Sequence, residues 1–267
     1  MKVVIFCGGQ GMRIREFSEA IPKHMVPLGY RPILWHVMRY YAHFGHKDFI
    51  LCLGHKADSI KAYFRNYDET ISNDFVLEAG QQVELLSKDI QDWRITFVDT
   101  GLNSNIGQRL MAVRPFLEGE ETFLANYGDG LTDCQLPEMI DYFTARRAVA
   151  CFIGVAPTSS FHLVDWADGG QVKSIRHIKD IGLRINGGFF ILRRDIFDYM
   201  RDGEELVEQP FGRLASEGKL LVYPFDGFWA CMDTFKERQL LEEMHAKGHP
   251  PWEVWRRDSG PVPVARK

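Results

Sequence analysis

The chain contains 267 residues with a formal net charge of −4, and 45% of its residues are hydrophobic and 25% are charged. This composition is typical of a globular protein with one large α/β domain and a small elaboration. The charge gives no electrostatic basis for binding nucleic acid or an anionic membrane, and no apolar run approaches the roughly 20 residues that cross a bilayer.

The first predicted element is a buried parallel strand over residues 3–6, a continuous apolar run. Residues 7–13 follow with the spacing Gly-Gly-x-Gly-x-Arg, which is neither the dinucleotide fingerprint nor the Walker loop. Glycines let a ligand approach the main chain, whose N–H groups can bind phosphate oxygens. Arg13 and Lys23 add positive charge. The run indicates a nucleotide or triphosphate site, with an ordinary glycine turn as the alternative.

The next elements alternate between helix and strand. A helical pattern over residues 32–44, a buried strand over 48–53 and a second helix over 57–67 predict a parallel sheet with right-handed crossovers. Residues 68–92 are irregular, and we expect an excursion that contacts a neighbouring subunit or covers the site. A further strand is predicted over residues 94–98.

Small polar residues and glycines then lead into a predicted helix over residues 106–113. Ser104 lies just before this helix, whose N-terminus favours an anionic or hydrogen-bonding ligand. Arg109 lies in the first turn, where a positive charge opposes the helix dipole. A bound anion would explain its presence there, and an ordinary surface arginine is the alternative.

A strand over residues 122–127 ends at Gly128-Asp129-Gly130. A carboxylate at the C-terminal end of a parallel strand lies where open α/β sheets bind ligands, although an Asp-Gly pair is also a common turn. Asp133 is a candidate N-cap for a helix over residues 136–147.

The remaining chain is predicted to add a few more elements to the same domain. Residues of about 157–185 shift to short strands and turns, with a hairpin signal at Asp168-Gly169-Gly170, and form a candidate sugar-side subregion. Strands are expected over residues 148–155, 189–192 and 220–225, and helices over 195–200 and 235–247. Trp252 and Trp255 are expected to pack on the body or on another subunit. One domain is expected over residues 1–257, with 258–267 as a disordered tail.

The cysteines indicate a reducing environment. The five cysteines (Cys7, Cys52, Cys134, Cys151 and Cys231) form no Cys-x-x-Cys pair, so we expect reduced thiols that serve packing. No signal peptide is expected, because Lys2 leads directly into a strand. Both points predict a cytoplasmic protein.

Several motifs occur in a recognisable order: the glycine-rich run, Pro22-Lys23-His24-Met25, Pro32 to His36, Val98 to Gly101, Tyr127 to Gly130, Ile185 to Phe190, Phe228-Trp229 and Met232-Asp233-Thr234. Together they resemble the sugar-1-phosphate nucleotidyltransferases, most closely the glucose-1-phosphate cytidylyltransferases of that family. The resemblance implies a Rossmann-like, mostly parallel sheet flanked by helices. It also implies a homo-oligomer that uses Mg²⁺ to transfer a cytidylyl group from CTP to a sugar 1-phosphate, most simply α-D-glucose 1-phosphate.

This reaction requires no protein nucleophile, because the protein positions two polyanions and neutralises their charge. By resemblance, the catalytic residues are Arg13, Lys23 and Asp129, and the Mg²⁺ ligands are Asp129 and Asp233. Ser104, Gly107 and Arg109 are expected to flank the base. The resemblance gives these substrate-binding residues: Phe6, Cys7, Gly8, Gly9, Gln10, Gly11, Met12, Arg13, Lys23, Ser104, Gly107, Arg109, Gly128, Lys179 and Asn186.

Two departures from the family pattern concern the phosphate and sugar contacts. Met12 stands where the family usually has threonine, and residues 175–180 lack the family's Glu-Lys-Pro run. Lys179 or Arg176 is a candidate substitute for the missing lysine. Two alternatives therefore stay open: the same chemistry with another sugar phosphate or base, and a non-catalytic relative that binds a nucleotide.

Overall fold

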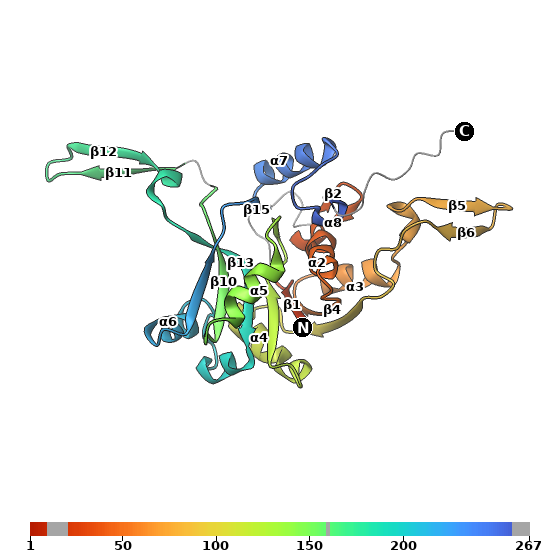
Figure 1. The fold of residues 1–267 in the computed structure, drawn as a ribbon, viewed down its shortest axis with the longest axis horizontal. Coiled ribbons are helices and arrows are strands. Elements are labelled where there is room, and N and C mark those ends of the chain that lie inside the picture. The colour runs from red at the N-terminus through yellow and green to blue at the C-terminus, as the bar shows by residue number, and fades with distance from the viewer. Residues whose placement is uncertain (10–20, 159–160, 258–267) are drawn as a thin grey trace.

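The structure, a computed structural model, describes residues 1–9, 21–158 and 161–257, and a seven-stranded sheet forms its centre (Figure 1). The strand order is β14-β10-β13-β8-β1-β4-β7. The strands are β1 (Val3–Phe6), β4 (Asp48–Leu53), β7 (Arg94–Asp99), β8 (Thr122–Asn126), β10 (Ala150–Val155), β13 (Ile185–Arg193) and β14 (Leu220–Pro224). Only β13 is antiparallel to its neighbours within this sheet. The predicted mostly parallel α/β sheet is therefore confirmed.

Helices cover both faces of the sheet. They are α2 (Ile33–His43), α3 (Ala57–Arg65), α4 (Ile106–Val113), α5 (Leu136–Thr144), α6 (Gln209–Ser216), α7 (Phe235–Ala246) and α8 (Val254–Arg257). Val3 and Ile5 of β1 pack in the core cluster that contains α2 and α5, whereas Val4 and Phe6 pack in the cluster that contains α4 and α6. Because side chains alternate along a strand, burial on both faces explains why β1 is apolar throughout.

A short ribbon outside the large sheet joins two distant parts of the chain. Strand β9 (Gly130–Thr132) pairs antiparallel with β15 (Trp229–Cys231), and Gly130 lies opposite Cys231. The N–H of Met232 donates to the carbonyl oxygen of Asp129 at 3.0 Å. This pairing brings the chain before β9 beside the chain after β15.

Two hairpins project from the body in opposite directions (Figure 1). One is β5 (Phe75–Glu78) with β6 (Gln82–Leu85), within the predicted excursion, and the other is β11 (His162–Trp166) with β12 (Val172–His177). The second turns at Gly169 and Gly170, both with positive φ, as the hairpin signal predicts. The first is anchored by buried Asp89, which accepts hydrogen bonds from Tyr67 and from Arg31. Arg31 belongs to the short strand β3 (Arg31–Pro32), which pairs with β2 (Pro27–Leu28).

Two local predictions have clear outcomes. Asp133 is not the N-cap of α5: Gln135 holds that position, and Asp133 Oδ1 instead accepts the Phe228 N–H at 2.8 Å. The expected packing of the tryptophans on the body is confirmed, since Trp252 is 1% exposed and Trp255 contacts Trp35 edge to face at 5.9 Å between ring centroids. The predicted tail of residues 258–267 lies outside the described residues. Among the described helices, none is long and apolar enough to cross a membrane.

Candidate active site

Three charged side chains from distant parts of the sequence converge at one point. Lys23 Nζ donates to Asp129 Oδ2 at 2.5 Å and also to Asp233 Oδ1. Lys23 belongs to the 3-10 helix η1 (Lys23–Met25), Asp129 follows β8, and Asp233 follows β15. The Lys23 side chain is 10% exposed, against 21% for Asp129 and 32% for Asp233. The structure therefore brings both predicted metal ligands to a single ammonium group, and the β9–β15 pairing places the two aspartates close together.

The main chain before Asp129 is held by its neighbours. The Gly128 N–H donates to Asn126 Oδ1 at 2.6 Å, and Gly128 has a φ of +80°. A Cβ atom at Gly128 would lie 2.8 Å from His24 Cδ2 and 2.9 Å from Ile5 Cγ2. Gly128 is thus required by a positive φ and by packing against His24 and Ile5. Its predicted contact with a nucleoside stays a prediction.

Asp233 is positioned by the start of α7. Glu237 accepts the N–H groups of Asp233 and Thr234, each at 2.8 Å, and Thr234 caps the helix in return. The Cys231 thiol donates weakly to Asp233 Oδ2, with a sulfur–oxygen distance of 3.7 Å. Cys231 therefore lies inside the charged cluster instead of serving packing alone. The Thr-x-x-Glu pattern of a capping box was the sequence signal that could have identified Glu237 as part of the site.

The two titratable residues of η1 have different charge states: Lys23 is a cation and His24 is neutral. Burial acts to lower the pKa of Lys23, but the charges of Asp129 and Asp233 and their hydrogen bonds outweigh burial and raise this pKa above its ordinary value. Burial also lowers the pKa of His24. His24 Nε2 lies 3.0 Å from the carbonyl oxygen of Tyr127, which can only accept. The imidazole is therefore neutral with its proton on Nε2, and it holds the main chain just before Asp129.

Arg109 organises the glycine loop from within. Its side chain is buried and donates to Thr100 Oγ1 at 2.7 Å and to the carbonyl oxygen of Gly8 at 3.0 Å. The carbonyl oxygens of Leu53, Gly101 and Leu102 accept further hydrogen bonds. The surface-arginine alternative is wrong, because the side chain is buried and its hydrogen bonds go to carbonyl and hydroxyl oxygens of the protein. The bound-anion interpretation stays a prediction. Its contact with a base stays a prediction.

Several other residues predicted to bind the nucleotide are engaged within the protein. A Cβ atom at Gly8 would lie 1.9 Å from Arg109 Nη1, and one at Gly107 would lie 2.2 Å from the carbonyl oxygen of Glu204. Ser104 Oγ donates to the carbonyl oxygen of Thr100 at 2.5 Å. These contacts explain the residue types by packing, and they leave main-chain contacts to a nucleotide untested.

The start of the glycine-rich run is only partly described. Phe6 and Cys7 are buried and Gly9 is exposed. Burial raises the pKa of the Cys7 thiol well above its ordinary value, so the thiol is neutral and part of the core. Gln10, Gly11, Met12 and Arg13 lie outside the described residues.

The two predicted sugar-side residues lie in different surroundings. Asn186 donates to the Tyr127 hydroxyl at 3.1 Å and accepts the Gly188 N–H at 2.9 Å, so it fixes the chain next to Asp129. Lys179 lies in η4 (Ile178–Ile181) at the foot of the β11–β12 hairpin, with an exposed side chain. Its main-chain N–H donates to His177 Nδ1 at 3.1 Å. Of these two residues, Asn186 is the one linked to the Asp129 region, through its hydrogen bond to the Tyr127 side chain.

The sequence profile of the nucleotidyl transferase family matches residues 2–234. The chain belongs to this family. Two relatives are the glucose-1-phosphate cytidylyltransferases of Salmonella typhi and Salmonella typhimurium, each 38% identical over 257 residues, which cover 96% of this chain and 100% of the relative. The crystal structure of HddC from Yersinia pseudotuberculosis has a TM-score of 0.66 at 20% identity, with 91% of this chain and 99% of that chain covered. That similarity concerns the fold alone, and the predicted family and fold are both confirmed.

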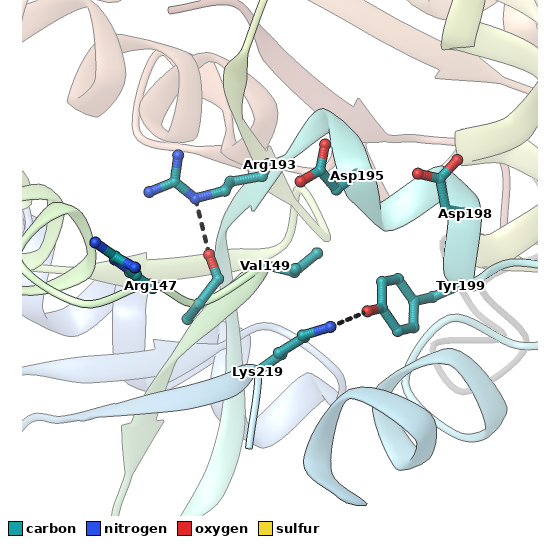
Figure 2. A pocket seen from close by; sticks show the side chains of 8 residues that line it. Arg147, Val149, Arg193, Asp195, Asp198, Tyr199 and Lys219 are labelled. Carbon is teal, nitrogen blue, oxygen red and sulfur yellow. Dashed lines mark hydrogen bonds between the residues drawn. The ribbon is translucent and has the colours of Figure 1, made fainter. Parts of the chain in front are cut away.

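This nucleotidyl transferase also has a cavity of about 650 Å³ at the end of the sheet strands opposite to Asp129 (Figure 2). It lies where β10 begins and β13 ends, and it is lined by Arg147, Ala148, Val149, Arg193, Asp195, Asp198, Tyr199 and Lys219. Lys219 donates to the Tyr199 hydroxyl at 2.7 Å, and Arg193 donates to the carbonyl oxygen of Ala148 at 2.9 Å. Because ligands of open α/β sheets bind at the C-terminal ends of the parallel strands, the surroundings of Asp129, and not this cavity, are the candidate active site.

Proposed function

We propose that this nucleotidyl transferase transfers the cytidylyl group of CTP to a sugar 1-phosphate, most simply α-D-glucose 1-phosphate, giving a CDP-sugar and pyrophosphate. The observation that carries the proposal is the convergence of Asp129 and Asp233 on Lys23. The 38% identity to cytidylyltransferases over their full length supports the choice of base and sugar.

The two carboxylates fit a Mg²⁺ ion. Magnesium is usually bound through one or two carboxylates, and substrate phosphates and water complete its coordination. Asp129 and Asp233 offer two oxygens that already meet at one cationic group. In the described part of the chain, no cluster of three or more potential metal-ligating side chains occurs, which agrees with a site completed by the substrate. When bound, Mg²⁺ would neutralise phosphate charge and orient the triphosphate.

The chemistry proceeds without a covalent enzyme intermediate. An oxygen of the sugar phosphate attacks the α-phosphorus of CTP, a new P–O bond forms, and the bond from the α-phosphorus to pyrophosphate breaks. Lys23 is held as a cation at the site, so it can stabilise the negative charge that develops on the leaving pyrophosphate. Arg13 is proposed to assist in the same role. His24 and Asn126 act indirectly, since their hydrogen bonds hold the main chain next to Asp129.

A different sugar is the second candidate. It is favoured by residues 175–180, which lack the family's Glu-Lys-Pro run, and by the exposed side chains of Arg176 and Lys179 in that segment. Either basic residue could contact the phosphate of a sugar other than glucose.

We also propose a cytoplasmic homo-oligomer. Five free cysteines support a reducing compartment, and exposed apolar residues on both projecting hairpins support subunit contacts.

One assay separates these candidates. The protein is incubated with Mg²⁺, each nucleoside triphosphate and a panel of sugar 1-phosphates, and pyrophosphate release is measured. Release with CTP and glucose 1-phosphate is the expected result. Release with another pair would change the assigned base or sugar. Nucleotide binding without release from any pair would indicate a non-catalytic relative and would defeat the proposal.

A further inference from the structure

Lys23 occupies the point at which the two proposed metal ligands meet. Its ammonium group contacts Asp129 Oδ2 and Asp233 Oδ1 at the same time. Cys231 already donates to the other oxygen of Asp233. The oxygens that face the common point are therefore the ones that Lys23 holds. A divalent cation that binds both carboxylates there must compete with the ammonium for these oxygens.

The main chain at all three residues is held by hydrogen bonds, so the replacement of the ammonium by a cation can involve only side-chain movement. The carbonyl oxygen of Lys23 accepts the Val26 N–H at 3.1 Å, and the Asp233 N–H is held by Glu237 at 2.8 Å. The Asp129 carbonyl oxygen is held by Met232 at 3.0 Å. An aspartate side chain is short, whereas lysine carries its charge on a flexible four-carbon stem. Lys23 can therefore swing away while both carboxylates stay in place.

We propose that the Lys23 ammonium competes with the divalent cation for Asp129 and Asp233 in the nucleotide-free protein, and that nucleotide phosphates relieve this competition by drawing the ammonium away. The inference rests on the proposed function, because it concerns the same metal and the same phosphates. In this view, the Lys23 ammonium moves from the carboxylates of Asp129 and Asp233 to the phosphates of the nucleotide. By linkage, metal and nucleotide then raise each other's affinity, and the metal is held firmly only when a triphosphate is present.

The test uses the full chain without nucleotide and Mn²⁺ as the metal probe, with free Mn²⁺ counted by electron paramagnetic resonance. Lys23→Met and Lys23→Gln remove the competing charge, and Lys23→Arg retains a positive charge. Lys47→Met is the matched control, because Lys47 also pairs with an aspartate, Asp92, but at the surface. We expect Met and Gln at position 23 to tighten Mn²⁺ binding at least about tenfold, while the Arg variant and the control stay near wild type.

The site of binding and the folded state are checked in the same series. Adding Asp129→Asn to Lys23→Met should abolish the gain, and circular dichroism identifies the variants that keep their secondary structure. Equal or weaker Mn²⁺ binding by folded Lys23→Met and Lys23→Gln would overturn the inference, since Lys23 would then only brace the carboxylates. The wild-type pyrophosphate assay is read separately. Loss of the proposed function appears there as absent turnover, whereas failure of the competition appears in the nucleotide-free titration.

Discussion

At the scale of single residues, the two acids of the site do different work from the glycines beside them. Asp129 and Asp233 hold charge at one point, whereas Gly8 and Gly128 remove atoms that would collide with Arg109 and His24. The first pair is therefore expected to govern turnover, and the glycines are expected to govern stability.

Asp129→Asn keeps the shape of the side chain but removes a negative charge from the metal site. We expect turnover to fall on the order of 10²-fold or more, as happens when a preorganised electrostatic group is lost, with little change in the thermal midpoint. Pyrophosphate release measures the effect. Asp226→Asn is the control, because Asp226 pairs with Arg184 at the surface. Near-normal turnover of Asp129→Asn would mean that the metal ligand has been misassigned.

Gly8→Ala and Gly9→Ala form a matched pair of adjacent substitutions. A Cβ atom at Gly8 would lie 1.9 Å from Arg109 Nη1, whereas one at Gly9 would have no heavy atom of the described residues within 4 Å. We expect Gly8→Ala to lower the free energy of unfolding by about 1–3 kcal/mol through overpacking, and Gly9→Ala to change it by less than about 0.5 kcal/mol. Urea denaturation measures both values. Equal losses in the free energy of unfolding for the two variants would show that the Arg109 side chain can move aside for the added methyl group at no energetic cost.

At the scale of elements, short segments far apart in the sequence hold the site and the nearby core in place. The β9–β15 ribbon aligns the two acids, and the C-terminal segment closes the core against α2. His36 of α2 links that segment: its Nε2 lies 3.0 Å from the carbonyl oxygen of Leu28, and its Nδ1 accepts from Trp252 Nε1 at 3.4 Å. Both contacts require a neutral imidazole with the proton on Nε2.

Stability is expected to fall in acid because of this buried histidine. Burial lowers the pKa of His36 to about 4, while an unfolded histidine titrates near 6.5. Between these values the unfolded chain binds the extra proton and the folded protein does not. The stability that depends on a neutral His36 is therefore fully present above about pH 6.5 and is lost as the pH falls toward 4. We expect it to amount to about 3 kcal/mol. His36→Gln should flatten the pH dependence of the unfolding free energy over this range, and an unchanged slope would contradict the assignment.

At the scale of the whole molecule, the sequence predicted the parts that depend on local patterns. The bounds of β4 agree with its apolar run, and α4 agrees with its helical spacing. The β9–β15 pairing was missed because each strand has three residues and its partner lies about a hundred residues away. The antiparallel direction of β13 and the buried position of Arg109 depend on tertiary contacts. Such contacts leave no periodic signal, so only the structure revealed how the site is held together.

The two projecting hairpins are the least explained part of the molecule, and subunit contacts would account for them. An isolated two-stranded ribbon is marginally stable in water, yet β11 and β12 pair Trp166 with Val172 and Val164 with Ile175. Trp166 is 65% exposed, Val172 is 56% exposed and Ile175 is 62% exposed. A second copy of the chain would bury this apolar surface.

We therefore expect an oligomer in solution that depends on this hairpin. Trp166→Ser combined with Ile175→Ser should lower the molar mass measured by light scattering, because the apolar contact between subunits is removed while the body of the protein is untouched. Lys173→Ser, which changes a charged residue of the same strand, β12, should leave the mass unchanged. A monomeric wild type would remove the basis of the prediction. An unchanged mass for the double variant would show that the subunits meet at another surface. The β5–β6 hairpin, with its exposed Leu77 and Val83, would then be the next surface to test.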